Sequence, residues 1–427
     1  MIHETSVRLN RDGVLGRRDF LRSTAAGVAA TGLGLTGALR SSAAELKEQG
    51  MHCILLFMQG GPSQFETFDP KPGTDTGGPT EAIDTSVGGI KVASHWPNVA
   101  KQMDDIALIR SLTGREGNHI RAQYLLHTGY APSGSVKYPN FGSVAANELG
   151  DANFDLPRFV AVAGPTATGA GFLDASVAPY LVGDPNQMPL NSTLPAGVDE
   201  NDLKRRLKLM SKVEGEFAKT GAEPLVDMHQ AINKTAARMA TSPRLKAFDL
   251  SQEKDSLRDK YGRTPFGQGC LLARRLVETG VTFVEVVSRN WDTHRDNFNE
   301  SERLSGIVDP GFATLVADLK DRGLLEKTLV VWMGEFGRTP RINGRTGRDH
   351  YPRASNIALA GGGVKGGQVI GATDEKGYAV TDRPVTVPDL FCTFCAGLGI
   401  SPRKRNYADT RPIRIVEGGE PVKEVFG

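Results

Sequence analysis

The stretch TFVEVVSRNWDTH, residues 282–294, decides the fold class, because a short apolar run leads directly into Asp292 and His294. Apolar runs of this length that are rich in Val, Ile and aromatic residues are typical of buried strands. Two other runs are followed by side chains of the same kinds: His52–Met58 by Glu66 and Asp69, and Leu329–Met333 by Glu335, Asp349 and His350. Ligand sites of open α/β sheets form beyond the carboxyl ends of the strands. We therefore expect these side chains to meet at one edge of a sheet.

The chain from Gly50 onward alternates short apolar runs with helical patterns. This alternation predicts an α/β fold with a mostly parallel sheet covered by helices on both faces. Further strands are expected at Ile106–Ile109, Phe159–Val162 and Ile357–Ala360. Helices are expected around Tyr124 and at Phe141–Leu149, Asp202–Glu216, Val226–Ala240, Gln268–Glu278, Pro310–Arg322 and Val387–Leu398. The charged segment of about residues 199–261 is interpreted as a helical insertion in one domain, residues 45–427.

The first 44 residues have the pattern of a twin-arginine export signal. Arg17-Arg18-Asp19-Phe20-Leu21 precedes the Ala- and Gly-rich stretch Ser23–Leu39, and Ser42-Ala43-Ala44 offers small residues for cleavage. This order of basic, apolar and small-residue regions is typical of a cleaved signal peptide. A permanent membrane anchor is the alternative, but the apolar stretch is short for a membrane span. We expect a periplasmic or secreted protein without a stable membrane anchor after cleavage.

The composition argues against some partners and cofactors. The 427 residues include 51 basic and 49 acidic side chains, a formal net charge of +2, so bulk charge gives no reason to expect nucleic acid as a partner. The glycine-rich stretches 60–63 and 361–367 lack the lysine of a P-loop and the spacing of a dinucleotide fingerprint. The second stretch predicts a hairpin or a turn between strands.

The four cysteines favour structural roles. Cys392 and Cys395 form a CxxC motif, but they lie in a helical pattern and no second motif completes a zinc site. Cys53 and Cys270 fall in a predicted strand and helix, where a free cysteine behaves as a small buried apolar residue.

The carboxylates and imidazoles predict a divalent metal site. Asp292 and His294 lie on either side of Thr293 in the segment that follows a predicted strand. On a loop, both side chains can therefore turn toward one ion. Further candidate ligands are Glu335 and the pair Asp349–His350, while a salt bridge to Arg338 is the alternative for Glu335. Arg338, Arg345 and Arg348 are close in sequence, and arginine pairs well with planar oxyanions. They predict an anionic ester or polyanionic ligand, unless they only neutralise the acidic loop.

Several ordered blocks carry a family resemblance. They are Gly60-Gly61-Pro62-Ser63, Phe68-Asp69-Pro70-Lys71-Pro72, Asn118-His119, His127-Thr128-Gly129-Tyr130, Asp292-Thr293-His294, Glu335-Phe336-Gly337-Arg338-Thr339-Pro340, Arg348-Asp349-His350 and Gly371-Ala372-Thr373-Asp374. With these blocks and its signal, the chain resembles, over nearly its whole length, an exported bacterial family of unknown function (domain of unknown function fifteen-oh-one). That family lies within the alkaline phosphatase and sulfatase superfamily. The resemblance implies a three-layer α/β/α sandwich with a metal site at the carboxyl ends of its strands.

The resemblance also implies residue roles, with one clear departure. Superfamily hydrolases place an Asp after the first strand, where Glu66 or Asp69 stands here, and Asp and His ligands after later strands. Asp292, His294, Glu335 and His350 fall in that later region. Their nucleophile is a hydroxyl or formylglycine at a helix start, but no Cys-x-Pro-Ser-Arg or Ser-x-Pro-Ser-Arg sequence occurs here. His119 stands in the corresponding segment, with Ser111 and Thr113 as nearby hydroxyls.

Two functions are therefore expected. The first is a metal-dependent hydrolase of phosphate or sulfate esters, including esters on polysaccharides, that uses zinc, calcium or manganese. In it, His119 or Thr113 is the nucleophile or proton carrier, and Arg121 and Arg338 hold the oxyanion. The alternative is a non-catalytic protein on the same scaffold that binds a metal ion or a polyanionic glycan. A structural protein of the cell envelope is a third hypothesis without direct support.

Overall fold

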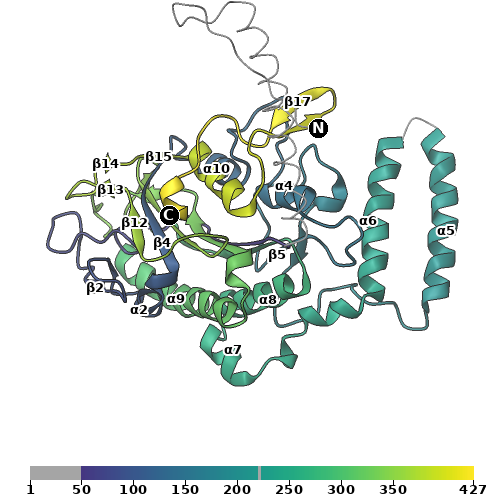
Figure 1. The fold of residues 1–427 in the computed structure, drawn as a ribbon, viewed down its shortest axis with the longest axis horizontal. Helices are drawn as coiled ribbons and strands as arrows, with labels where there is room; N and C mark the ends of the chain where they lie inside the picture. The colour runs from purple at the N-terminus through teal and green to yellow at the C-terminus, as the bar shows by residue number, and fades with distance from the viewer. Residues whose placement is uncertain (1–49, 220–222) are drawn as a thin grey trace, which may run out of the picture. The chain divides into compact units, whose positions relative to one another are not determined.

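The computed structural model describes residues 50–219 and 223–427, and a nine-stranded sheet runs through the described chain (Figure 1). In spatial order its strands are β12 (Gln368–Ile370), β4 (Ile106–Thr113), β11 (Ser355–Ala360), β8 (Thr328–Gly334), β1 (His52–Met58), β7 (Phe283–Ser288), β5 (Phe159–Val162) and β6 (Tyr180–Val182), and β15 (Val385–Thr386) also pairs with β4. Only β11 runs antiparallel to its neighbours in this sheet. The prediction of a mostly parallel α/β sheet is thus confirmed.

The helices and the smaller strand pairs surround this sheet. The helices are α2 (Pro97–Lys101), α3 (His119–Thr128), α4 (Phe141–Glu148), α5 (Glu200–Phe217), α6 (Glu223–Thr241), α7 (Asp255–Tyr261), α8 (Pro265–Thr279), α9 (Asn297–Asp321) and α10 (Val387–Leu398). The smaller pairs are β2 (Ala82–Asp84) with β3 (Lys91–Ala93), β9 (Gly337–Arg338) with β10 (His350–Tyr351), β13 (Ala372–Thr373) with β14 (Val380–Asp382), and β16 (Arg405–Ala408) with β17 (Arg411–Arg414).

Alternate residues of the strands face two different helical layers. Ile54 and Leu56 of β1 belong to the core cluster that includes the buried faces of α8 and α9. Cys53 and Leu55 instead line a small void together with side chains of α4 and α10. Successive side chains of a strand point to opposite faces, so a sheet that is buried on both sides needs apolar residues at nearly every position. Helices α8 and α9 and helices α4 and α10 cover opposite faces (Figure 1), which makes three layers.

Helix α9 is the main departure from the expected elements. The helical pattern in the sequence predicts a helix over Pro310–Arg322. In the structure the helix begins at Asn297 and Pro310 lies inside it. Proline removes one backbone donor from a helix. The apolar packing of Leu304 and Val308, both buried, nevertheless continues the helix through this position.

The glycine-rich stretch 361–367 connects two strands of the main sheet. Gly361, Gly362 and Gly363 all have positive φ angles, which suit glycine. They take the chain from β11 on one side of β4 to β12 on the other side. Of the two expected roles, the turn between strands is the one observed, rather than a hairpin.

The described part of segment 199–261 is helical. Helix α5 packs on α6, and none of the residues of α5 is buried. All four cysteines are free and buried, with Cys392 and Cys395 inside α10. The predicted export signal lies outside the described residues. Among the described helices, none has the length and apolar character that crossing a bilayer requires.

Candidate functional site

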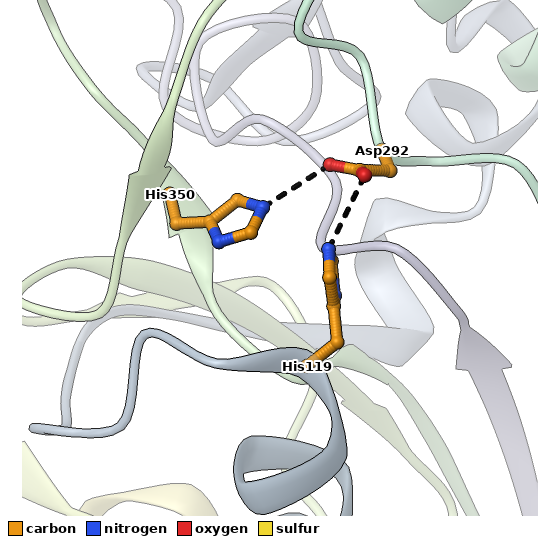
Figure 2. A group of neighbouring side chains, drawn as sticks. All are labelled: His119, Asp292 and His350. Atoms are coloured by element: carbon orange, nitrogen blue, oxygen red, sulfur yellow. Dashed lines mark hydrogen bonds and ion pairs between the residues drawn. The ribbon is translucent and has the colours of Figure 1, made fainter.

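Four polar side chains from separate parts of the chain meet beyond the strand ends. Asp292 follows β7, Glu335 directly follows β8, His119 is the first residue of α3, and His350 is the first residue of β10. Figure 2 shows that His119, Asp292 and His350 point toward one another, and their ligand atoms all lie within 4.8 Å of one another. His294 joins this group from the loop after Asp292.

Helix α3 presents His119 through its local sequence. Asn118 caps the helix, since its side chain accepts a hydrogen bond from the backbone N–H of Arg121, and Gly129 ends the helix with a φ of 75°. His119 and Gln123 are four residues apart and therefore share one helix face. Both reach the same carboxylate: Nδ1 of His119 lies 2.7 Å and Nε2 of Gln123 lies 3.0 Å from Oε1 of Glu335.

The glycine loop after β1 is part of the same site, although the sequence analysis assigned it no role there. The backbone N–H of Gly60 donates to both oxygens of Glu335, at 2.9 and 3.1 Å. Gly60 has a φ of 120°, and a Cβ there would lie 2.4 Å from the backbone nitrogen of Asp292. Only glycine permits this approach of the two loops. The available signal was the Gly-Gly pair directly after a buried strand.

Asp292 lies at the centre of three imidazoles. Its Oδ1 is 3.1 Å from Nε2 of His294 and 3.2 Å from Nε2 of His350. Its Oδ2 is 3.3 Å from Nε2 of His119, which is buried and has no aligned hydrogen-bond partner. All three rings therefore direct the same nitrogen toward one carboxylate.

The other nitrogen of each ring is held by an acceptor outside this group. Nδ1 of His119 faces Glu335, Nδ1 of His350 lies 2.8 Å from the carbonyl oxygen of Gly117, and Nδ1 of His294 lies 2.8 Å from Oδ1 of Asp349. Because these acceptors need a proton on Nδ1, each neutral ring presents a lone pair at Nε2. Carboxylates and carbonyls in this position are typical of the partners that orient metal-binding histidines.

The short distance between His294 and His350 also supports the interpretation that these histidines are oriented to bind a metal ion. Their Nε2 atoms are 2.9 Å apart. Two lone pairs at this distance repel each other unless a proton or a cation lies between them. The two imidazoles and the carboxylate of His119, His350 and Asp292, with His294 beside them, are donors that fit a transition metal such as zinc or manganese. They fit calcium poorly, because calcium is bound by six to eight oxygen ligands.

The charges of the site are set by its partners. Burial alone would raise the pKa of Asp292, but hydrogen bonding and the charge of Arg338 lower it to about 2. The hydrogen bond to Glu335 raises the pKa of His119 above its ordinary value. Burial lowers the pKa of His350. Asp292 is therefore anionic at neutral pH, and His350 has a stronger tendency to stay neutral than His119.

Arg338 orients Asp292 and does not face solvent. Its side chain is fully buried, and Nη2 donates to Oδ1 of Asp292 at 2.7 Å. Nη2 also contacts the carbonyl oxygens of Gly60 and Trp291, while Nε donates to that of Gly61 and Nη1 to that of Arg348. The sequence predicts that Arg338 holds an oxyanion, but its fully buried guanidinium has no surface that a ligand from solvent can reach.

The other predicted residues lie in separate contacts. Glu66 forms a buried ion pair with Arg348 at 2.9 Å, and Asp69 pairs with Lys71 and accepts a hydrogen bond from Thr373. Neither carboxylate contacts the three imidazoles or Asp292. Their oxygens are bound instead by Arg348, by Lys71 and by the hydroxyl of Thr373.

Thr113 and Arg121 also have other partners. The hydroxyl of Thr113 donates to the carbonyl oxygen of Val385 at 3.3 Å, between β4 and β15. The guanidinium of Arg121 is half exposed and bonds both oxygens of Glu116. Of the predicted nucleophile candidates, His119 is the one that the structure places beside Asp292.

Comparisons with known proteins give a family but no established activity. A family model described as "Protein of unknown function (DUF1501)" matches residues 51–426. The comparison with curated proteins found no match.

Solved structures that resemble the chain include a sulfatase from Pseudoalteromonas sp. (14% identity, 86% of this chain and 71% of that chain, TM-score 0.37). Another is a phosphonate monoester hydrolase from Silicibacter pomeroyi, with 11% identity over 88% of this chain and 76% of that chain and a TM-score of 0.37. A third is a protein in the alkaline phosphatase superfamily from Vibrio parahaemolyticus, with 11% identity over 82% of this chain and 67% of that chain and a TM-score of 0.36. These likenesses are loose, and no activity is derived from them.

Proposed function

Since the chain belongs to the family described as "Protein of unknown function (DUF1501)", whose description assigns no activity, we propose a function from the site itself. The match confirms the family that the sequence motifs predicted. The proposed function is metal-dependent hydrolysis of phosphate or sulfate esters, including esters carried by polysaccharides.

One observation carries this proposal: three Nε2 atoms converge on the carboxylate of Asp292, while an acceptor binds each Nδ1. His119, Asp292, His294 and His350 would hold the ion, and zinc or manganese suits these donors better than calcium. A bound divalent ion would polarise an ester oxygen and stabilise the negative charge that develops in the transition state.

The protein's own groups supply orientation and access. Arg338 and Glu335 fix the directions of Asp292 and His119 from the buried side. On the other side the site is open at Asp292, whose side chain is 45% exposed, and Nε2 of His119 lies buried directly behind this carboxylate. An ester group can therefore approach from solvent. His119, held by Glu335 at Nδ1, is placed to carry a proton at Nε2 when it does not bind the ion.

The alternative function is binding without turnover. No Ser, Thr or Cys stands at the start of α3, where His119 is the first helical residue. A site that retains metal ligands without a hydroxyl nucleophile suits a protein that binds a metal ion together with an anionic glycan.

Loading and assay of the purified protein separate the two functions. We expect zinc or manganese, and not calcium, to support hydrolysis of aryl phosphate or aryl sulfate esters. His119→Ala is expected to reduce turnover by at least about 100-fold, the lower range for loss of a group that transfers a proton. His229→Ala, at a side chain on α6 that is 56% exposed, is the control and should keep full activity.

The metal content of the His119→Ala protein then assigns the role of this histidine. Unchanged content with lost turnover makes His119 a proton carrier, and lost content makes it a ligand. If the wild-type protein binds zinc and a sulfated glycan but hydrolyses no ester under any metal, the hydrolase proposal is overturned and the binding function replaces it.

Export through the twin-arginine pathway is a separate part of this proposal. The transport machinery reads the arginine pair itself. Replacing Arg17 and Arg18 by lysine, which keeps the charge, should therefore leave the precursor in the cytoplasm. Cell fractionation followed by immunoblotting measures this. Replacing Arg8 and Arg11 by lysine is the matched control, and normal export of the Arg17/Arg18 variant would contradict the signal assignment.

A further inference from the structure

Helix α3 has a row of polar side chains on the face that it turns toward the sheet. His119, Gln123 and His127 are spaced by four residues and therefore lie one above another. The first two contact Glu335 beyond β8. The third contacts Glu285 within β7, with 3.0 Å between Nε2 of the histidine and Oε1 of the glutamate. One helix is thus tied by polar contacts to β7 and to the end of β8, the two strands that flank β1.

The His127–Glu285 pair is deeply buried and has a defined proton arrangement. Each side chain is 1% exposed. Nδ1 of His127 lies 2.7 Å from the carbonyl oxygen of Gln123, which can only accept a hydrogen bond. Burial alone would lower the pKa of His127, yet the facing carboxylate of Glu285 raises it overall. Nδ1 therefore carries the proton that the carbonyl oxygen of Gln123 accepts, while Nε2 faces Glu285, and these two contacts fix the direction of the ring.

The position of Glu285 links this pair to the proposed metal ligands. Its strand pairs with β1 and β5, where Glu285 is opposite Leu55 and Ala161, so Glu285 lies in the middle of the sheet. The same strand leads into the loop that carries Asp292. The helix that carries His127 begins with His119. The pair therefore connects the two elements whose ends place His119 and Asp292 3.3 Å apart.

We propose that His127 and Glu285 form a positioning pair, which holds helix α3 against β7 so that His119 meets Asp292 at the proposed metal site. The inference rests on the proposed function for its metal readout. Stability alone is a weak reason for such a pair, because a well-packed apolar pair of similar volume is often as stable as a buried ion pair or more stable. A buried ion pair differs from an apolar contact in its direction and its fixed distance, which are the properties that a metal ligand requires.

The test compares a polar and an apolar replacement. In His127→Leu/Glu285→Leu both buried charges are removed together, so the fold is retained, but helix α3 is no longer held by a directed contact. We expect the zinc affinity of this protein, measured by competition with a chromophoric chelator, to fall by about tenfold, the low end for loss of groups that orient metal ligands. Glu285→Gln keeps a side chain that can hydrogen bond to His127 and should keep nearly the wild-type affinity.

A matched control separates positioning from stability. Asp318→Asn alters another ion pair, that between Asp318 of α9 and the buried Arg274 of α8, which does not contact the site. It should lower the midpoint of urea unfolding without changing the zinc affinity. If the double leucine protein is folded and binds zinc as tightly as the wild type, the positioning role is overturned.

If the proposed metal site itself is wrong, the wild-type protein will bind no zinc, and this result differs from the one that overturns the positioning role. Long-range ¹H–¹⁵N NMR spectra of the histidines still test the inference in that case. We expect the wild-type protein to show a proton on Nδ1 of His119 that is hydrogen bonded to Glu335, and the double leucine protein to lose this signal. An unchanged His119 signal would contradict the positioning role.

Discussion

Replacing Arg348 with methionine is expected to lower the free energy of unfolding by about 3–5 kcal/mol, the usual cost when one partner of a buried ion pair is removed. Arg348 and Glu66 are both fully buried and their charged atoms are 2.9 Å apart. The guanidinium lies 4.3 Å from the ring centre of Phe65 and also donates to the carbonyl oxygen of Thr76. Methionine fills the space but leaves the carboxylate of Glu66 without a cation.

Urea denaturation followed by circular dichroism measures this loss. Arg303→Met is the control, since Arg303 pairs with Glu300 on the exposed surface of α9 and should cost less than about 1 kcal/mol. Combining Arg348→Met with Glu66→Leu removes both charges and should recover most of the loss. A loss below about 1 kcal/mol for Arg348→Met alone would mean that the buried pair does not stabilise this fold.

Replacing Asp292 with alanine is expected to weaken zinc binding by more than about 100-fold. Asp292 is the one carboxylate that all three imidazoles face, at 3.1, 3.2 and 3.3 Å. Removing only an outer partner of a metal ligand costs roughly 10- to 100-fold. The loss of the central carboxylate should exceed this range, because it removes both a donor atom and the negative charge of the site.

Asp349→Asn is the graded control for this experiment. Asp349 contacts Nδ1 of His294, on the outer side of the ring, so its loss should fall within the range of roughly 10- to 100-fold. Asp292→Asn should weaken zinc binding while it retains an acceptor for Arg338, so its unfolding midpoint should stay near that of the wild type. Tight zinc binding by the Asp292→Ala protein would remove this residue from the metal site.

The proximity of Asp292 and Glu335 has a physical reason that the sequence already contains. Strands β1, β7 and β8 are parallel neighbours, so their carboxyl ends lie at the same edge of the sheet. Asp292 and Glu335 follow two of these strands and are both in contact with His119. Their proximity therefore follows from the sheet, and the sheet is readable from the apolar runs.

Position after a strand does not distinguish Glu66 from Asp292. Both carboxylates follow a buried strand, but Glu66 faces the buried Arg348 and Asp292 faces three imidazoles. Arg338 is an example of the opposite kind. Its position close to Glu335 in the sequence suggested an arginine that binds a ligand. In the structure its donors are bound by carbonyl oxygens and by Asp292. Sequence position does not reveal which of several oppositely charged neighbours a side chain meets.

By itself, the sequence determined the α/β sheet, most of its helices and the edge where polar side chains gather, because apolar periodicity reflects burial directly. Only the tertiary structure decided which polar atoms face each other. The Nδ1 partners of His119, His294 and His350 come from Glu335, Asp349 and the carbonyl of Gly117, contacts that span up to 233 positions in the chain. These contacts depend on loop paths and on close approaches such as that of Gly60 to Asp292, and neither leaves a periodic pattern in the sequence.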